Sequence, residues 1–265
     1  MTENEEPESK QTEHTLAPDV GGEGAKGPSP TILPEGPVMV VAAHPDDADI
    51  GCGGAIARLS AEGRKVVVVV VTDGSEGGED PAMPDEHLRD VRESEQRAAL
   101  RELGVEDVEF LRFPDGRLEA NFALRRTLTR LIRRHRPMTV FAHDPTAHLF
   151  DGYINHPDHR AAGMATLDAV YPAARNPRAF RELLAEGLSA HHVKYVYLFY
   201  TTHANAWIDI SGQPLERKIA ALAHHKSQLG DNWDGATWLR EGAEREGKEA
   251  GLAAAEGYRR IILED

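Results

Sequence analysis

Cysteine is almost absent from this chain. Among 265 residues there is one cysteine, Cys52. A single cysteine excludes an intramolecular disulfide framework and any cysteine-rich zinc or iron–sulfur site. We therefore expect a protein of a reducing compartment, with the cytoplasm as the default location.

Long hydrophobic runs are also missing. The six valines at 66–71 are far too few to cross a bilayer. No basic amphipathic segment that would lie on a membrane surface is present either. The first residues, MTENEE, offer neither the basic region nor the apolar region of a signal peptide. The sequence thus predicts no membrane partner.

Positive charge is scarce as well. The chain has 30 Lys and Arg against 44 Asp and Glu, a net charge of −14. Binding to phosphate backbones needs clustered basic side chains, so we expect no nucleic-acid partner. The stretch 1–36 is acidic, rich in proline and poor in large apolar residues, which predicts a disordered tail. We expect a main domain over 37–230 and a C-terminal extension over 231–265, for which helix is predicted.

What is present is an alternation of strand and helix patterns. Strands are predicted at 38–43, 65–72, 108–111, 138–142, 194–200 and 207–210, and helices at 55–62, 86–103, 122–135 and 215–229. A run of valines is typical of a strand buried on both faces, as in a parallel sheet. Strands separated by helices predict an α/β fold, here a Rossmann-like three-layer α/β/α sandwich with a mostly parallel sheet. In such sheets, sites form at the carboxyl ends of the strands.

Two such places carry nearly the same motif. The first predicted strand runs into AHPDD at 43–47, and the loop after Asp144 ends in NHPDH at 155–159. Two imidazoles and a carboxylate are a ligand set of catalytic zinc, which His44, Asp47 and His159 could supply. Fe²⁺ or Co²⁺ would also accept these donors. Ordinary surface polarity is the competing interpretation, since the chain has 13 histidines.

The residues beside these ligands suggest acid–base chemistry. Asp46 would be free to take a proton from a metal-activated water. His156 lies three residues before His159 and can face the same site. We expect Asp158 to hydrogen-bond to the ring of His156 and keep it protonated.

Four segments together resemble one family. AHPDDADIGCGG, VTDGSEGG, FPDGRL and NHPDHRAAG are similar to the motifs of the LmbE-like (PIG-L) deacetylases, over about 38–230. The resemblance implies a Rossmann-like zinc enzyme that removes the acetyl group of an N-acetylglucosamine-containing small molecule. It implies zinc binding by His44, Asp47 and His159, and a general base at Asp46. His156 would then stabilise the oxyanion or protonate the leaving amine, oriented by Asp158.

Further expectations follow from the same resemblance. Arg92, in VRESEQRAA, matches an arginine that contacts substrate hydroxyls in the family, and a solvated helix charge is the alternative. Some members have a carbonyl-polarising tyrosine two residues before the first histidine of the second motif, whereas Tyr153 lies three before His156. Many members have Glu after the Asp pair, where this chain has Ala48. Family members often form homo-oligomers, so self-association is possible here.

Two other motifs have simpler interpretations. Gly51-Cys52-Gly53-Gly54 lacks the G-x-G-x-x-G spacing of a dinucleotide site. Close packing of a helix on the sheet explains it better, with Cys52 as a small buried residue. His224-His225 is interpreted as part of a polar helix face.

The leading hypothesis is a zinc-dependent N-deacetylase of a small glucosamine conjugate. An amidase acting on a larger thiol–sugar conjugate would use the same motifs. A metal-binding scaffold without catalysis and a nucleotide-binding protein are alternatives from other classes. The intact Asp46 opposes the scaffold, and the missing glycine fingerprint opposes the nucleotide binder.

Overall fold

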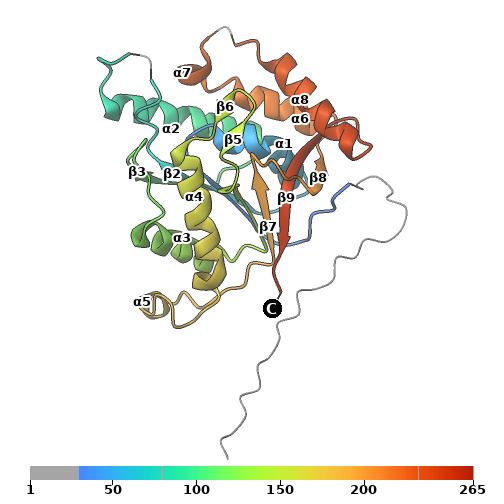
Figure 1. The fold of residues 1–265 in the computed structure, drawn as a ribbon. Helices are drawn as coiled ribbons and strands as arrows, with labels where there is room; N and C mark the ends of the chain where they lie inside the picture. The colour runs from blue at the N-terminus through green and yellow to red at the C-terminus, as the bar shows by residue number, and fades with distance from the viewer. Residues whose placement is uncertain (1–29, 79, 232, 265) are drawn as a thin grey trace, which may run out of the picture.

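A seven-stranded sheet forms the centre of the molecule. The computed structural model describes residues 30–78, 80–231 and 233–264, and Figure 1 shows the sheet between helices. The strand order is β3-β2-β1-β4-β7-β9-β8. In chain order these strands are β1 (Val38–Ala42), β2 (Val66–Thr72), β3 (Val108–Phe113), β4 (Thr139–His143), β7 (Tyr195–Phe199), β8 (Ala206–Asp209) and β9 (Ala255–Ile262).

Neighbouring strands from β3 to β7 are parallel, and β9 alone runs opposite to its neighbours β7 and β8. The chain leaves β1 toward β2 on one side, while β4 lies on the other side. The boundary between β1 and β4 is therefore the switch point at which α/β sheets form their sites. The predicted α/β fold with a mostly parallel sheet is confirmed.

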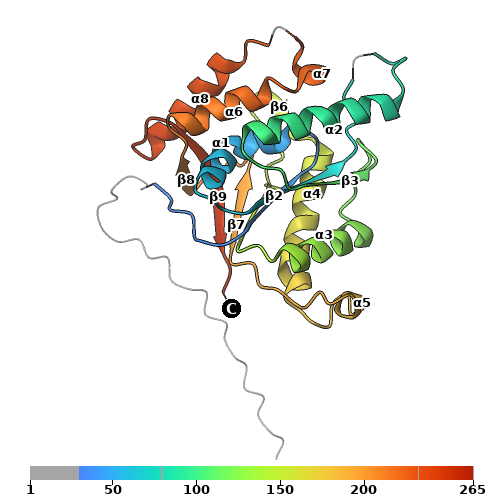
Figure 2. The same ribbon diagram turned by 180° about the vertical axis from the view of Figure 1, so that it is seen from behind.

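Helices cover both faces of the sheet, as Figures 1 and 2 show from opposite sides. One layer holds α1 (Asp47–Ala61), α2 (Asp85–Glu102), α6 (Gln213–Leu222) and α8 (Ala236–Glu249), and the other holds α3 (Phe122–His135) and α4 (Pro157–Asp168). Shorter elements are η1 (Ala169–Ala174), α5 (Glu182–Ala185), α7 (Lys226–Leu229) and the hairpin β5 (Leu149–Phe150) with β6 (Tyr153–Ile154). No helix in the described part of the chain is long and apolar enough to span a membrane.

Alternation along the strands divides the interior into two cores. Val66, Val68 and Val70 pack on the α1 face, whereas Val67, Val69 and Val71 pack on the α3 and α4 face. Successive strand residues point to opposite faces, so a run of valines fills both layers at once. This is why the polyvaline segment is a central strand.

Helix α1 begins earlier than its apolar pattern indicated and bends at Cys52, whose φ is −151°. A Cβ on Gly51 would lie 2.6 Å from Cδ2 of Phe199, and one on Gly54 would lie 2.7 Å from Cγ2 of Ile210. The glycines therefore allow the helix to approach β7 and the segment after β8 closely, and Cys52 is fully buried. The packing interpretation of this motif is confirmed.

The segment after Asp231 does more than form a helix. It contains α8 as expected, but it also supplies β9, which lies inside the sheet between β7 and β8.

The predicted tail 1–36 falls mostly on residues 1–29, outside the described residues. Within its remainder, Thr31 is buried, and its backbone N–H donates to the carbonyl of Trp207 at 2.7 Å. The continuous helix predicted over 215–229 is divided into α6 and α7.

Glu256 of β9 holds the bend of α1 in place. Its carboxylate accepts the backbone N–H groups of Gly54 and Ala55, each at 2.9 Å, and the ammonium of Lys218 at 2.7 Å. Glu256 and Lys218 are both buried. The side chain thus caps the second part of α1 and neutralises a buried cation.

Replacing Glu256 with alanine is expected to lower the free energy of unfolding by about 3–5 kcal/mol, because Lys218 would remain buried without its partner. Urea unfolding measures this loss. The exposed pair of Arg58 and Glu62 provides the control, since Glu62→Ala should have a much smaller effect. Equal effects of the two substitutions would contradict the role given to Glu256.

Candidate active site

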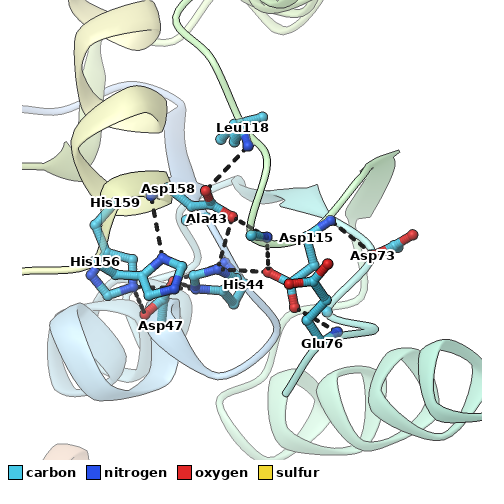
Figure 3. A network of polar contacts seen from close by, with 12 residues as sticks. Ala43, His44, Asp47, Asp73, Glu76, Asp115, Leu118, His156, Asp158 and His159 are labelled. Atoms are coloured by element: carbon cyan, nitrogen blue, oxygen red, sulfur yellow. Dashed lines mark hydrogen bonds and ion pairs between the residues drawn. The ribbon is translucent and has the colours of Figure 1, made fainter. Parts of the chain in front are cut away.

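The two histidine motifs converge at the carboxyl edge of the sheet. His44 and Asp47 follow β1, and Asp47 opens α1. His159 lies in the first turn of α4, whose N-cap is His156. Because β1 and β4 are neighbours, the segments after them meet above the switch point. Figure 3 shows the resulting cluster around the imidazole of His44.

Three side chains direct their donor atoms at one another. Nδ1 of His44 lies 3.2 Å from Nε2 of His159 and 3.2 Å from Oδ2 of Asp47. Nε2 of His159 lies 3.1 Å from Oδ1 of Asp47. Four donors at 2.0–2.1 Å around a tetrahedral zinc ion are separated from one another by about 3.3 Å. The observed separations therefore fit the three protein ligands of such an ion.

The second nitrogen of each ligand ring is also engaged. Nε2 of His44 lies 3.0 Å from Oδ1 of Asp115, and Nδ1 of His159 lies 3.0 Å from Oδ1 of Asn155. Metal-binding histidines typically donate their other N–H to an oxygen, which fixes the ring and its tautomer. The contacts thus leave Nδ1 of His44 and Nε2 of His159 available to bind a metal ion.

The charges of the cluster also favour a cation. Burial by itself would lower the pKa of His44, but hydrogen bonds to Asp115, Asp158 and Asp47 raise it to about 12. Although burial opposes ionisation of Asp47, the imidazoles of His159 and His143 hold its pKa well below the usual range. The carboxylates therefore stabilise positive charge at this point, and a bound divalent metal would supply it.

Asp46 lines the same cavity as His44, Asp47 and His159 but is not part of their cluster. Its backbone has a φ of 103°, an uncommon conformation that other contacts must hold. Burial and the charge of Asp47 raise the pKa of Asp46 to about 6, with Arg92 acting in the opposite direction. A carboxylate near that pKa is suited to accept a proton at neutral pH.

Arg92 is buried under Asp46 and holds the surrounding backbone. Its guanidinium donates to the carbonyl oxygens of Gly74 and Pro45, at 2.9 and 2.8 Å, and to Oδ2 of Asp46 at 3.2 Å. With an exposed fraction of 3 %, it is not a solvated helix charge. The contacts make it a positioning residue for Asp46, while its contact with substrate hydroxyls stays a prediction.

The prediction of a hydrogen bond between the side chains of His156 and Asp158 is wrong. Nδ1 of His156 instead accepts the backbone N–H of Asp158 at 3.2 Å. The Asp158 carboxylate turns away and accepts the N–H groups of Gly116 at 2.8 Å and Leu118 at 3.2 Å. Burial and the nearby charge of His44 lower the pKa of His156. Because Nδ1 accepts a hydrogen bond, the ring carries its proton on Nε2.

Sequence reasoning missed His143 at the end of β4. Its Nε2 accepts the backbone N–H of Ala43 at 3.0 Å, and its ring stacks on that of His159 with centroids 4.3 Å apart. Burial lowers the pKa of His143 to about 4. A neutral ring here keeps the plane of His159 fixed. Its only sequence signal was its position directly after the strand predicted at 138–142.

A buried polar chain behind Asp46 was also missed. The Gln96 side chain accepts the backbone N–H of Asp46 and donates to Oδ2 of Asp49, both at 2.7 Å. Nε2 of His225 lies 2.9 Å from the same Asp49 oxygen. His225 is fully buried, so the expectation of a polar helix face is wrong for it. These contacts tie α1, α2 and α7 together beneath the general-base candidate.

Replacing Gln96 with methionine is expected to lower kcat about ten-fold, because small displacements of a catalytic group are costly. The substitution removes both hydrogen bonds and keeps the side-chain length. KM and metal content should change little, which separates mispositioning of Asp46 from loss of the site. Gln213→Met, on the exposed start of α6, should leave all three quantities unchanged. A kcat of Gln96→Met equal to wild type would contradict this role.

A polar cavity of about 380 Å³ opens over the cluster. Its walls come from the loops after β2 and β3, from α2 and α7, and from the hairpin. Besides the motif residues they include Glu76, Arg92, Asp115, Tyr153 and Gln228. Such a wall offers many hydrogen-bonding groups, as a hydroxyl-rich ligand requires.

Several known proteins with similar sequences or structures are deacetylases. Residues 39–170 match the family described as "PIG-L: GlcNAc-PI de-N-acetylase". The chain is 35 % identical to diacetylchitobiose deacetylase of Thermococcus kodakarensis, over 84 % of this chain and 82 % of that protein. It is 32 % identical to 1D-myo-inositol 2-acetamido-2-deoxy-alpha-D-glucopyranoside deacetylase of Mycobacteroides abscessus, over 76 % and 84 %. The structure of N,N'-diacetylchitobiose deacetylase from Pyrococcus horikoshii aligns with a TM-score of 0.78 at 32 % identity, covering 85 % of this chain and 83 % of that one.

Proposed function

The chain belongs to the PIG-L family, and on that premise we propose that it is a metal-dependent hydrolase that deacetylates an N-acetylglucosamine unit of a small conjugate. One observation carries the proposal: the donor atoms of His44, Asp47 and His159 converge with Asp46 beside them. Two relatives support the substrate class, since the diacetylchitobiose and the inositol glycoside in their names both contain a 2-acetamido sugar.

The proposed metal is zinc, held by His44, Asp47 and His159. Two imidazoles and one carboxylate leave an open position, as in catalytic zinc sites. Fe²⁺ and Co²⁺ fit the same donors. When bound, the ion would polarise the amide carbonyl and make a water molecule more acidic.

The reaction is hydrolysis of the amide. Asp46 accepts a proton from the attacking water while the water oxygen bonds to the carbonyl carbon. Nε2–H of His156 donates a hydrogen bond to the oxyanion that develops on the carbonyl oxygen. The carbon–nitrogen bond then breaks, the proton held by Asp46 passes to the leaving amine nitrogen, and acetate remains. Asp158 supports this ring through its backbone N–H.

The polar cavity is the proposed place for the sugar. Glu76, Asp115 and Gln228 line it together with His44, Asp47 and His159. Their carboxylate and amide groups can pair with hydroxyls, which a buried sugar requires. Arg92 and Tyr153 are further candidates for such contacts.

The proposal is tested by acetate release from N-acetylglucosamine, diacetylchitobiose and an N-acetylglucosaminyl inositol. Acetate from at least one of them, only with metal present, is the expected result. A protein that binds one metal ion per chain but releases no acetate would contradict deacetylation. Cleavage of a larger thiol–sugar amide by that protein would instead establish the amidase alternative.

A further inference from the structure

A second cavity meets the polar one at the metal-ligand cluster. Its volume is about 430 Å³, and it shares Asp47, Tyr153 and His159 with the polar cavity. Its other lining residues are not shared with the polar cavity. They are Ile50 of α1, Phe150 of β5, Tyr200 after β7, and Trp238 of α8.

The two cavities differ in chemistry. Glu76, Asp115 and Gln228 give the first one hydrogen-bonding groups. Apart from the metal ligands, the second offers only aliphatic and aromatic surface and the phenols of Tyr153 and Tyr200. A sugar ring placed there would leave most of its hydroxyls without partners, at a cost in free energy. An apolar group would gain by entering it.

Part of this apolar wall is exposed. Trp238 has an exposed fraction of 62 % and Tyr153 one of 52 %. Exposed aromatic side chains at the rim of a cavity are typical of a surface that a ligand covers. Trp238 takes part in no step of the proposed hydrolysis, so its position at the rim calls for another explanation.

An amide has two sides, and the reacting carbon must lie at the cluster where the cavities meet. We propose that the amine side of the substrate, the sugar, lies in the polar cavity and the acyl side lies in the apolar cavity. The site then accepts N-acyl chains longer than acetyl. This inference rests on the proposed function and names its acyl-chain specificity.

The size of the cavity supports this assignment. The methyl of an acetyl group occupies a small part of 430 Å³, a volume within the roughly 300–1,000 Å³ of cavities that bind whole small ligands. Each methylene that becomes buried should improve kcat/KM by up to about four-fold. We therefore expect kcat/KM for N-hexanoylglucosamine to exceed that for N-acetylglucosamine by at least about ten-fold.

The experiment compares N-acetyl-, N-butyryl- and N-hexanoylglucosamine in the metal-loaded protein, by release of the free amine. Trp238→Ala should reduce the hexanoyl-to-acetyl ratio of kcat/KM by about ten-fold. Trp233→Ala is the matched control, because Trp233 lines neither cavity and the ratio should stay as in wild type. Calorimetry on Asp46→Asn, whose turnover is blocked, gives a second readout, with tighter binding expected for the hexanoyl compound.

Several results would overturn the inference. Acetate release together with rejection of the longer chains would do so while leaving the proposed function intact. A loss in Trp238→Ala confined to diacetylchitobiose would place a second sugar in the apolar cavity instead. If no compound is hydrolysed, the proposed function fails, and equal affinities of Asp46→Asn for the acetyl and hexanoyl compounds would overturn the inference separately.

Discussion

Replacing Asp46 with asparagine is expected to lower kcat by about 10²–10⁴-fold, the usual contribution of a general base. The substitution keeps the shape of the side chain and removes its ability to accept the water proton. The backbone contact with Gln96 involves the N–H of residue 46 and remains available, so the loop should keep its conformation. Acetate release and metal content, measured on the same preparation, test this expectation.

Metal content should stay at the wild-type value in Asp46→Asn, because the ligands are untouched. Asp107→Asn serves as the control for the chemical change, since Asp107 is exposed and pairs only weakly with Lys65, at 3.8 Å. It should retain full activity. An Asp46→Asn protein with wild-type kcat would exclude Asp46 as the base.

The second large effect is expected from His159→Ala, which removes one of the three proposed ligands. Changing a residue that merely supports a ligand typically costs 10–100-fold in metal affinity, so loss of a ligand should cost at least about 10²-fold. Activity should fall with the metal. Metal content after dialysis, and binding of Zn²⁺ in competition with a chelator, measure the change.

The exposed His224 offers a matched control for this substitution. His224→Ala should bind metal and turn over as the wild type does. Normal metal affinity in His159→Ala would show that the cluster is not the metal site. Restored metal binding by His159→Ala at high Zn²⁺, without activity, would agree with the assignment.

Much of the fold followed from local patterns. The valines at 66–71 predicted a doubly buried strand because both faces of the sheet are covered, and the structure gives them to the two cores alternately. Strand β9 was missed because its sequence, AEGYRRII, contains charged residues and a glycine. Those residues are accommodated by tertiary contacts, among them the pairing of Glu256 with Lys218.

That His44, Asp47 and His159 lie together could be predicted, because strand ends and motif spacing fix where backbones meet. The contacts of Asp158 could not, since they depend on the direction of its side chain within the first turn of α4. Nor could the chain of Gln96, Asp49 and His225, because it joins three helices far apart in sequence. Long-range side-chain partners of this kind leave no periodic signal.

The most direct test of the account is a metal titration of stripped protein, followed by acetate release from the best substrate. Activity should be absent without metal and rise with added Zn²⁺ to a plateau at one ion per chain. The same titration of Asp46→Asn should bind one ion and remain almost inactive. Undiminished acetate release by the stripped protein would contradict the account.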